Sequence, residues 1–195
     1  MNPGALRQYL KRQRGGLLLG AAAALALTIG LIGGEAAVST TQFCVSCHSM
    51  GYPAQELKKS THYGALGANP GCKDCHVPQG FANLHLAIAT HVLDGARELV
   101  LEFRNDYSDI AKFDARRAEM AHDARMNLKR WDSVTCRACH KDPQPPGADA
   151  RAAHDRMRTH KATCIDCHQN LVHKEVPESD LDASLAQGRR VAKGN

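Results

Sequence analysis

Aromatic residues are scarce in this chain, whose 195 residues include one Trp, four Tyr and four Phe. Large aromatic side chains supply much of the apolar area that a protein core buries. Because hydrophobic residues make up only 43% of the chain, the polypeptide by itself would bury a poor core. The alternation of apolar and polar residues that marks a half-buried β-strand is also missing. We therefore predict a mainly helical protein whose interior needs more than its own side chains.

Cysteine is absent outside four copies of Cys-x-x-Cys-His, at residues 44–48, 72–76, 136–140 and 164–168. All eight cysteines belong to these copies, so none is left for a disulfide or a free reactive thiol. In this pentapeptide the two thiols attach to the vinyl groups of haem c, and the histidine is presented to the iron. A zinc ribbon lacks a histidine after every cysteine pair, and a thioredoxin motif needs a βαβ context.

The motifs therefore predict four covalently bound haem c groups. The attachment residues are Cys44, Cys47, Cys72, Cys75, Cys136, Cys139, Cys164 and Cys167, and the motif histidines are His48, His76, His140 and His168. Four flat apolar porphyrins would supply the missing core, so loss of haem should mean loss of the fold. Their eight propionates turn the formal charge of +5 into about −3, which leaves a nucleic-acid partner unsupported.

The four motifs form two equal pairs. In both pairs the first cysteines are 28 residues apart. A further histidine recurs in each pair, 14 residues after one motif histidine and 10 before the next motif, and these two histidines are His62 and His154. We interpret the pattern as two di-haem modules from a duplication, near residues 44–76 and 136–168.

The second axial ligand of each iron must come from outside the motif histidines. Seven other histidines are present: His62, His85, His91, His122, His154, His160 and His173. The shared offset favours His62 and His154 as ligands, and His173, five residues after the last motif, ranks third. His122 and His160 are expected on solvated helix faces.

The first motif continues into Ser49 and Met50. A methionine thioether is a softer ligand than imidazole, and its ligation raises the haem potential. Met50 is therefore a candidate ligand of the first iron beside His48. Its alternative role is to pack against the porphyrin, and the spacing leaves both open.

A run of 20 residues without charge extends from Gly15 to Gly34. At 1.5 Å per residue a helix of that length spans the hydrocarbon core of a bilayer, about 30 Å. The run predicts a membrane anchor over residues 15–37, with the basic residues 1–14 held in the cytoplasm. A signal peptide cleaved near residue 37 is the alternative, although the hydrophobic region of a signal is usually shorter.

The remainder is one domain by length. We expect a tetrahaem cytochrome c domain over residues 38–175, exported to the periplasm as haem c assembly requires. A polar, loosely ordered tail is expected over residues 176–195. The anchor helix carries glycines at four-residue spacing, Gly16 with Gly20 and Gly30 with Gly34, which suggests a homo-oligomer through that helix.

Between the modules the spacing of apolar residues predicts two helices. The first covers residues 83–103, with Leu84, Ile88, Val92, Leu99 and Phe103 on one face. The second covers residues 114–131, with Asp114 as a possible N-cap. The proline-rich residues 142–147 predict a loop.

With these motifs the chain resembles the NapC/NirT family, which includes the NrfH-type membrane-anchored tetrahaem cytochromes. The resemblance covers essentially the whole chain, beginning with the basic N-terminus and the single anchor. The matching segments that follow are Phe43–Met50, His62–Tyr63, Cys72–Pro78, Asp132–His140 and Thr163–His168, with His173 beyond them.

The resemblance implies a quinol dehydrogenase of the bacterial cytoplasmic (inner) membrane, with its N-terminus inside and its haem domain in the periplasm. Members oxidise menaquinol or ubiquinol from the membrane quinol pool. They hand the electrons to a periplasmic terminal reductase for nitrate, nitrite, N-oxides or S-oxides, so anaerobic respiration is the implied setting.

The resemblance also implies roles for individual residues. Met50 would bind the first iron, and His48 then would not. The distal ligands of the other haems would be His62, His154 and His173. The carboxylate of the quinol site would be Glu98, which ends a sequence resembling the family's Gly-x-x-Asp.

Proton acceptors near that carboxylate follow from the residues themselves. His91 stands where relatives often have a lysine, and it lies seven residues before Glu98. That spacing places both on one face of a regular helix. Either side chain suits a general base once its pKa is perturbed. Asp94, one turn before Glu98, is a rival carboxylate.

Three alternatives stay open beside quinol oxidation. A terminal reductase would need an open haem facing water and a positively lined pocket, neither of which the sequence displays. A redox sensor or haem-handling protein would bring a signalling domain, of which the sequence gives no sign. A multihaem electron carrier fed by another protein would use the three bis-histidine haems as a wire.

Overall fold

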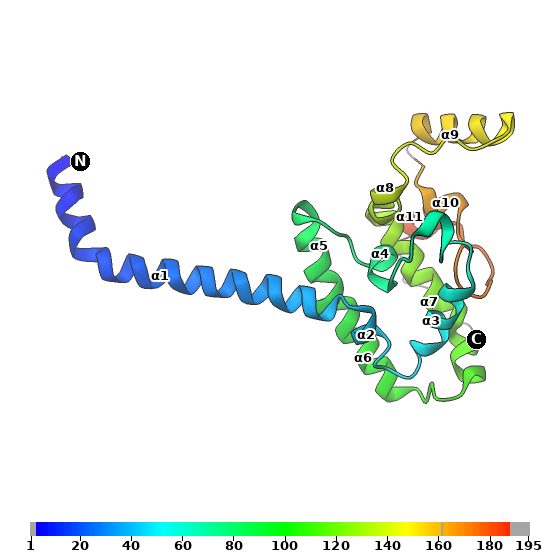
Figure 1. Cartoon of the computed structure of the whole chain (residues 1–195), viewed down its shortest axis with the longest axis horizontal. Coiled ribbons are helices and arrows are strands. Elements are labelled where there is room, and N and C mark those ends of the chain that lie inside the picture. Colours follow the sequence, from blue (N-terminus) through cyan, green and yellow to red (C-terminus); the bar gives the residue numbers. More distant parts are fainter. Residues whose placement is uncertain (1–2, 161, 188–195) are drawn as a thin grey trace. The chain divides into compact units, whose positions relative to one another are not determined.

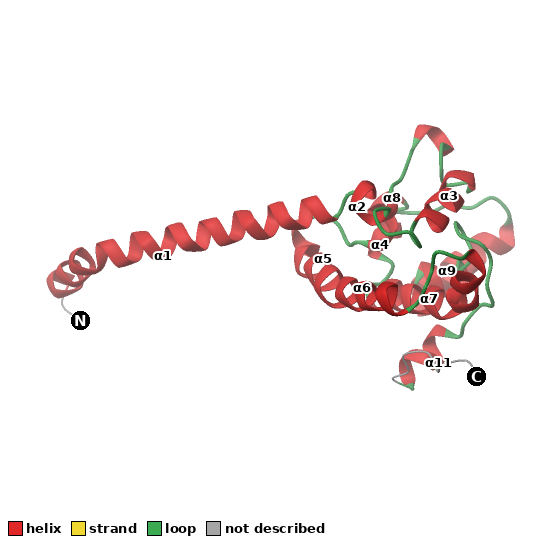
Figure 2. Cartoon of the chain, turned by 90° about the horizontal axis from the view of Figure 1, so that it is seen from below, coloured by secondary structure: helices red, strands yellow, loops and turns green. Residues whose placement is uncertain are grey.

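Helices dominate the computed structural model, which describes residues 3–160 and 162–187 (Figure 1). Loops join the helices, and the part of the chain so described contains no strand (Figure 2). The chain forms two compact units that divide between Val38 and Ser39. The prediction of a mainly helical protein is confirmed.

The first unit is the single helix α1 (Pro3–Val38). Within it, Lys11–Val38 is long and apolar enough to cross a membrane, judged by length and composition. Its leucines are exposed, Leu19 at 74%, and the Thr28 hydroxyl is satisfied inside the helix by donating to the Ala24 carbonyl. The predicted anchor over residues 15–37 lies within this helix. Its membrane crossing, orientation and self-association stay predictions.

The second unit consists of short helices that carry the cysteine motifs, together with one long helix. In chain order its elements are α2 (Thr41–Cys44), α3 (Gly51–Lys59), the 3₁₀ turn η1 (Ala65–Gly67), α4 (Cys72–His76), the 3₁₀ turn η2 (Phe81–Asn83), α5 (Leu84–Ala89), the π-turn η3 (Thr90–Asp94), α6 (Gly95–Arg104), α7 (Ile110–Arg130), α8 (Val134–Cys139), α9 (Ala148–His160), α10 (Cys164–Cys167) and α11 (Leu181–Ala186). Helix α7 packs against α10 and α11 (Figure 1).

The hydrophobic core of this unit is small. Met126 of α7, Ile165 of α10 and Leu181 of α11 form one buried cluster, each at most 6% exposed. Burying a side chain of this size contributes about 1.5–3 kcal/mol. Leu57, Val77, Ala87, Tyr107 and Phe113 are buried elsewhere in the unit. Together these side chains make a modest core for a domain of this length, as the scarcity of aromatic residues predicted.

The helix predicted over residues 83–103 is formed by η2, α5, η3 and α6. The π-turn interrupts its regularity, because the Gly95 N–H bonds to the Thr90 carbonyl five residues earlier. The expected apolar face is exposed in the polypeptide at Val92 (60%), Leu99 (51%) and Phe103 (85%). This face therefore does not belong to the protein core.

The helix predicted over residues 114–131 begins earlier, at Ile110. Asp109, not Asp114, is its N-cap, since the Asp109 carboxylate accepts the Ala111 N–H at 2.8 Å. The prediction of Asp114 was wrong because Phe113 is buried on the first turn and holds that turn in the helix. The predicted loop at residues 142–147 is present.

The C-terminal tail is better ordered than expected. Helix α11 forms within it, and Leu181 is 2% exposed. The buried Arg125 of α7 donates to the Pro177 carbonyl at 2.9 Å and to Asn170 Oδ1 at 2.8 Å. The expectation of a loosely ordered tail is wrong up to residue 187, and residues 188–195 lie outside the described residues.

His122 was expected on a solvated helix face, and that expectation is wrong. It lies on α7 one turn before Met126 and is 8% exposed. Burial lowers the pKa of its imidazole. His160 ends α9, and its side chain lies outside the described residues.

Candidate haem-binding site

The two modules repeat one local structure around their cysteines. In each module the thiols of the two first cysteines lie next to each other, Cys44 beside Cys72 and Cys136 beside Cys164. This contact lowers the pKa of Cys72 to about 6 and the pKa of Cys164 to about 6. The first cysteines of the two motifs in a pair are therefore neighbours in the fold.

Equivalent side chains support these contacts. A hydroxyl residue three positions before the first cysteine, Thr41 in one module and Ser133 in the other, lies beside the second motif's first thiol. A Cβ at residue 71 would lie 2.5 Å from the Thr41 hydroxyl oxygen, so a larger residue there would require the Thr41 side chain to move. The repeated contacts support the interpretation of a duplication.

Equivalent carboxylates cap the second motif of each pair. Asp74 accepts the Gly71 N–H at 2.6 Å, and Asp166 accepts the Thr163 N–H at 2.7 Å. A carboxylate at this place satisfies a free N–H at the start of a helix. Asp166 is further held by Lys129 at 2.7 Å, which ties α10 to α7.

Three motif histidines each face a histidine from outside the motifs. The ring centroids are 6.4 Å apart for His140 and His62, 6.1 Å for His76 and His173, and 6.2 Å for His168 and His154. An iron between two imidazoles would hold their centroids about 6.3 Å apart, since a metal–nitrogen bond is about 2.0–2.1 Å and a ring nitrogen lies about 1.1 Å from the centroid. The residues present therefore fit three irons with two histidines each.

The pairing crosses the modules. His62 belongs by sequence to the first module but faces the third motif, and His173 follows the last motif but faces the second. His154 alone faces a motif of its own module. The equal offsets singled out two histidines that each face a motif histidine, yet those offsets do not reflect equivalent partners.

The three outer histidines differ in what surrounds Nδ1, the ring nitrogen turned away from the facing histidine in such a pairing. His154 Nδ1 lies 3.4 Å from the Pro143 carbonyl, and His173 Nδ1 lies 3.5 Å from Glu56 Oε2. His62 Nδ1 and His173 Nδ1 are both buried with no hydrogen-bond partner in the described part of the chain. Burial lowers the pKa of His76 to about 4, which favours the neutral imidazole that binds metal.

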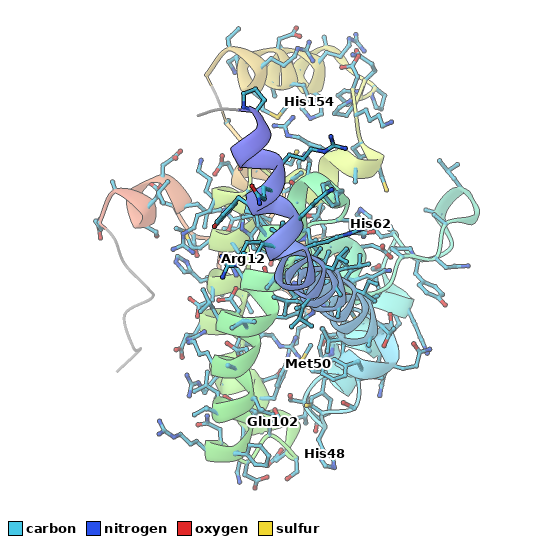
Figure 3. All side chains as sticks on the ribbon, turned by 90° about the vertical axis from the view of Figure 1, so that its left-hand side faces the viewer. Arg12, His48, Met50, His62, Glu102 and His154 are labelled. Atoms are coloured by element: carbon cyan, nitrogen blue, oxygen red, sulfur yellow. The ribbon has the colours of Figure 1, made fainter. Side chains whose placement is uncertain are left out.

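The first motif lacks such a pair. His48 is exposed and makes no ring contact with another histidine among the described residues. Met50 is 38% exposed at the start of α3. Between them Ser49 is buried, and its backbone N–H and hydroxyl both donate to Glu102, at 3.3 and 2.6 Å. Figure 3 shows Glu102 beside His48 and Met50.

The three residues predicted for proton transfer lie elsewhere along the helical segment that carries Glu102. His91 Nδ1 lies 3.2 Å from the Ala87 carbonyl, and Asp94 accepts a hydrogen bond from Asn127 at 2.9 Å. Glu98 is paired with Arg97 at 2.8 Å and is half exposed. Partial burial raises the pKa of Glu98.

The π-turn separates His91 from Glu98. One extra residue in a helical turn changes the face of the following residues by about 100°. The seven-residue spacing therefore does not align these two side chains as it would in a regular helix. Glu102, and not Glu98, is the carboxylate that contacts the residue next to the first motif. In the sequence Glu102 could have been found as the acidic residue one helical turn after Glu98, at i+4.

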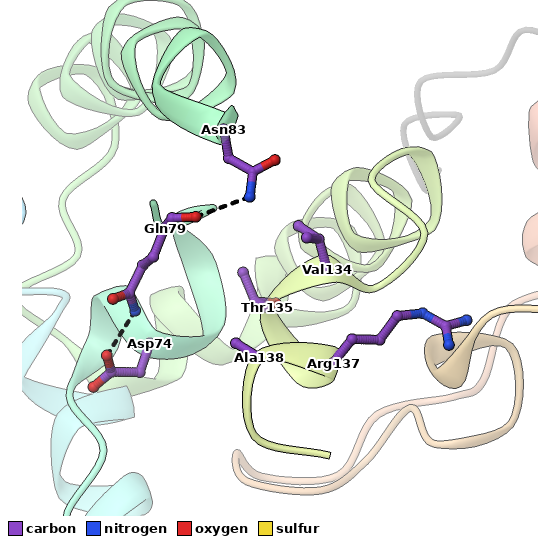
Figure 4. Close-up of a pocket in the computed structure, with 7 residues that line it drawn as sticks. All are labelled: Asp74, Gln79, Asn83, Val134, Thr135, Arg137 and Ala138. Atoms are coloured by element: carbon purple, nitrogen blue, oxygen red, sulfur yellow. Dashed lines mark hydrogen bonds between the residues drawn. The ribbon is translucent and has the colours of Figure 1, made fainter. Parts of the chain in front are cut away.

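A cavity of about 290 Å³ lies between the helices that carry the second and third motifs. Asp74 and Gln79 line one side of it, and Thr135 and Arg137 line the other (Figure 4). Gln79 donates to Asp74 at 2.7 Å and accepts from Asn83 at 2.8 Å. The hydroxyl of Thr135 is buried without a partner in the described residues.

The sequence model of the NapC/NirT cytochrome c family, N-terminal region, matches residues 10–179. The chain belongs to this family. It is 67% identical to a protein of Nitrosomonas europaea named "Probable tetraheme cytochrome c-type", over 92% of this chain and 77% of that protein. Covalently bound haem is therefore its cofactor.

Other relatives are more distant. The chain is 33% identical to the cytochrome c-type protein NapC of Haemophilus influenzae, over 87% of this chain and 84% of that protein. It is 35% identical to the cytochrome c-type protein TorY of the same organism, over 80% of this chain. The chain spans only 42% of TorY. No solved structure matches this NapC/NirT cytochrome.

Proposed function

We propose that this NapC/NirT cytochrome oxidises menaquinol or ubiquinol at the inner membrane and passes the electrons to a periplasmic terminal reductase. One observation carries the proposal. Three motif histidines face a second histidine at the spacing of an iron, whereas the first motif has an exposed His48 and a carboxylate bonded to the neighbouring Ser49. The first haem is thus the one with a distinct environment.

The proposed ligand pairs are His140 with His62, His76 with His173, and His168 with His154. At the first motif the ligand is Met50, as in NrfH-type relatives, with His48 as the alternative. Bound haem supplies a centre that accepts and donates one electron at a time. Bis-histidine ligation leaves no open position for a small substrate, which assigns electron relay to those three sites.

Quinol oxidation also releases two protons, and the chain must accept them. We assign this step to Glu98, with His91 and Asp94 as neighbouring acceptors on the same helical segment. Glu98 suits the role because it is half exposed and its pKa is raised by partial burial. Glu102 is a positioning residue, since it holds the segment between the two candidate ligands of the first iron.

Two apolar surfaces support a membrane location. Helix α1 contains the segment Lys11–Val38, long and apolar enough to span a bilayer. Basic residues precede its apolar run, which supports an N-terminus in the cytoplasm. Val92, Leu99 and Phe103 are exposed apolar side chains on the segment that carries the proton acceptors. We assign these side chains to the membrane surface, where quinol would enter.

The partner reductase is proposed by class. The relatives named NapC and TorY suggest a periplasmic reductase of the nitrate, nitrite or N-/S-oxide type. A homo-oligomer through α1 is a further proposal, because Gly16, Gly20, Gly30 and Gly34 leave open space around their Cα atoms.

The test uses the haem-loaded, detergent-solubilised oxidised protein. A reduced menaquinol or ubiquinol analogue is added and the haem α-band is followed. Rapid reduction that is lost in Glu98→Gln, and kept in the control Asp149→Asn on the exposed surface of α9, supports the proposal. Reduction by dithionite but by neither quinol would instead indicate a carrier fed by another protein.

A further inference from the structure

The three outer histidines have different neighbours at Nδ1, and one of these neighbours is charged. His154 Nδ1 lies beside a neutral carbonyl, whereas His173 Nδ1 lies 3.5 Å from the carboxylate of Glu56. Neither His62 Nδ1 nor His173 Nδ1 has a hydrogen-bond partner in the described residues. A carboxylate that accepts the far N–H of a metal-bound histidine makes the imidazole a stronger electron donor. Stronger donation stabilises the oxidised iron and lowers its reduction potential.

The Glu56 carboxylate is held in place from several sides. Arg117 approaches it with both terminal nitrogens, NH2 at 2.9 Å from Oε1 and NH1 at 3.0 Å from Oε2. The Lys174 backbone N–H, next to His173, donates to Oε2 at 3.2 Å. The Arg117 side chain is 8% exposed and that of Glu56 is 23% exposed. A carboxylate fixed in this way cannot rotate away from the imidazole.

Arg117 is itself neutralised by a second carboxylate. Asp114 lies 2.8 Å from it on the preceding turn of α7 and also pairs with Lys174. The Arg117 charge is therefore shared between Asp114 and Glu56, and Glu56 is the carboxylate that faces His173. A carboxylate beside Nδ1 favours a protonated Nδ1, which leaves Nε2 as the free ligand atom.

We propose that Glu56 accepts the Nδ1–H of His173 and thereby lowers the reduction potential of the second haem relative to the other bis-histidine haems. The inference rests on the proposed ligand pair of His76 and His173. The present 3.5 Å between His173 Nδ1 and Glu56 Oε2 needs to shorten by only about 0.5 Å to become an ordinary N–H···O bond. Glu56 acts through His173 and is a positioning residue.

The experiment is a potentiometric titration of the full-length, haem-loaded protein, followed by electron paramagnetic resonance. Glu56→Gln keeps the shape of the side chain and removes its charge. The expected result is a positive shift in the midpoint potential of one haem and a change in the largest g value of that haem's signal. The other haems keep their potentials.

A control variant separates this effect from a general loss of charge. Glu119→Gln removes a carboxylate of similar exposure, 26%, which pairs with Arg116 on α7. It is not expected to shift a single haem. Where Glu56→Gln fails to fold, Glu56→Asp withdraws the carboxylate by one methylene and is expected to raise the same potential by a smaller amount.

Three results would overturn the inference: no shift in a folded four-haem Glu56→Gln protein, an equal shift in Glu119→Gln, or a shift spread over all haems. His173→Ala tests the ligand pair separately. It is expected to convert one low-spin haem to high spin. A protein that keeps all its low-spin signals in His173→Ala would refute the proposed ligand, whatever Glu56→Gln does.

Discussion

The Glu102 carboxylate accepts two hydrogen bonds from Ser49, one from its backbone N–H at 3.3 Å and one from its hydroxyl at 2.6 Å. Ser49 stands between His48 and Met50, the two candidate ligands of the first iron. The contact joins the last turns of α6 to the first motif. Hydrogen bonds to a charged group of this kind contribute about 1.5–3 kcal/mol each.

Removing the Glu102 carboxylate should affect the first haem and leave the other three unchanged. We expect Glu102→Ala to change the spectrum of one haem and to slow quinol reduction, while the other three haems keep their spectra. The physical reason is that Ser49 loses both acceptors and the His48–Met50 segment loses its fixed position. Magnetic circular dichroism of the oxidised protein reports the ligands of each haem. An unchanged spectrum in Glu102→Ala would mean that the first site holds its ligands without α6.

The proton acceptor should appear in the pH profile of quinol reduction. Partial burial raises the pKa of Glu98, opposed by Arg97. A protonated Glu98 cannot accept the quinol proton, so the rate should fall as the pH decreases through this raised pKa. Below it the wild-type protein should lose activity, and above it activity should be full. In Glu98→Gln the rate should be low and should lack this acid limb.

Stopped-flow reduction at a series of pH values checks this expectation. Asp94→Asn is a suitable comparison, because Asp94 is engaged with Asn127. If the acid limb persists in Glu98→Gln and disappears in Asp94→Asn, then Asp94 is the acceptor.

Leu181 should matter far more than its neighbour in the same helix. Leu181 is 2% exposed against Met126 and Ile165, whereas Leu185 is 46% exposed. Leu181→Ala should destabilise the haem-loaded protein by about 2–5 kcal/mol, because it leaves a cavity in a small core. Leu185→Ala should cost less than about 0.5 kcal/mol. Thermal unfolding and limited proteolysis of the C-terminal segment measure the difference, and equal effects would mean that α11 does not pack as described.

The contrast between the motifs and this tail illustrates what the sequence reveals. Each Cys-x-x-Cys-His is a local signal, so its chemistry can be read without knowing the fold. The packing of Leu181 depends on Met126 and Ile165, which come from other helices, and no local pattern marks it in a polar segment. For the same reason His122 was taken for a solvated residue although it is buried.

The site shows the same division. The equal offsets of His62 and His154 identified both as special, because duplication preserves spacing. Their partners depend on how the modules fold against each other. The spacing therefore does not predict that His62 faces His140 of the third motif. Glu102 was missed because it lies one turn beyond Glu98, and the π-turn at Thr90–Asp94 changes which residues share a face.

The outer histidines offer the most direct test of the haem environment. Each of His62→Ala and His154→Ala should convert one low-spin haem to high spin, because each removes one of two facing imidazoles at an iron. The double variant should give two high-spin haems. The control His85→Ala, an exposed residue on α5, should give none. Quantified electron paramagnetic resonance of the oxidised proteins counts the converted haems. A double variant with a single high-spin haem would mean that His62 and His154 do not serve separate irons, since removing ligands of two independent sites must convert both.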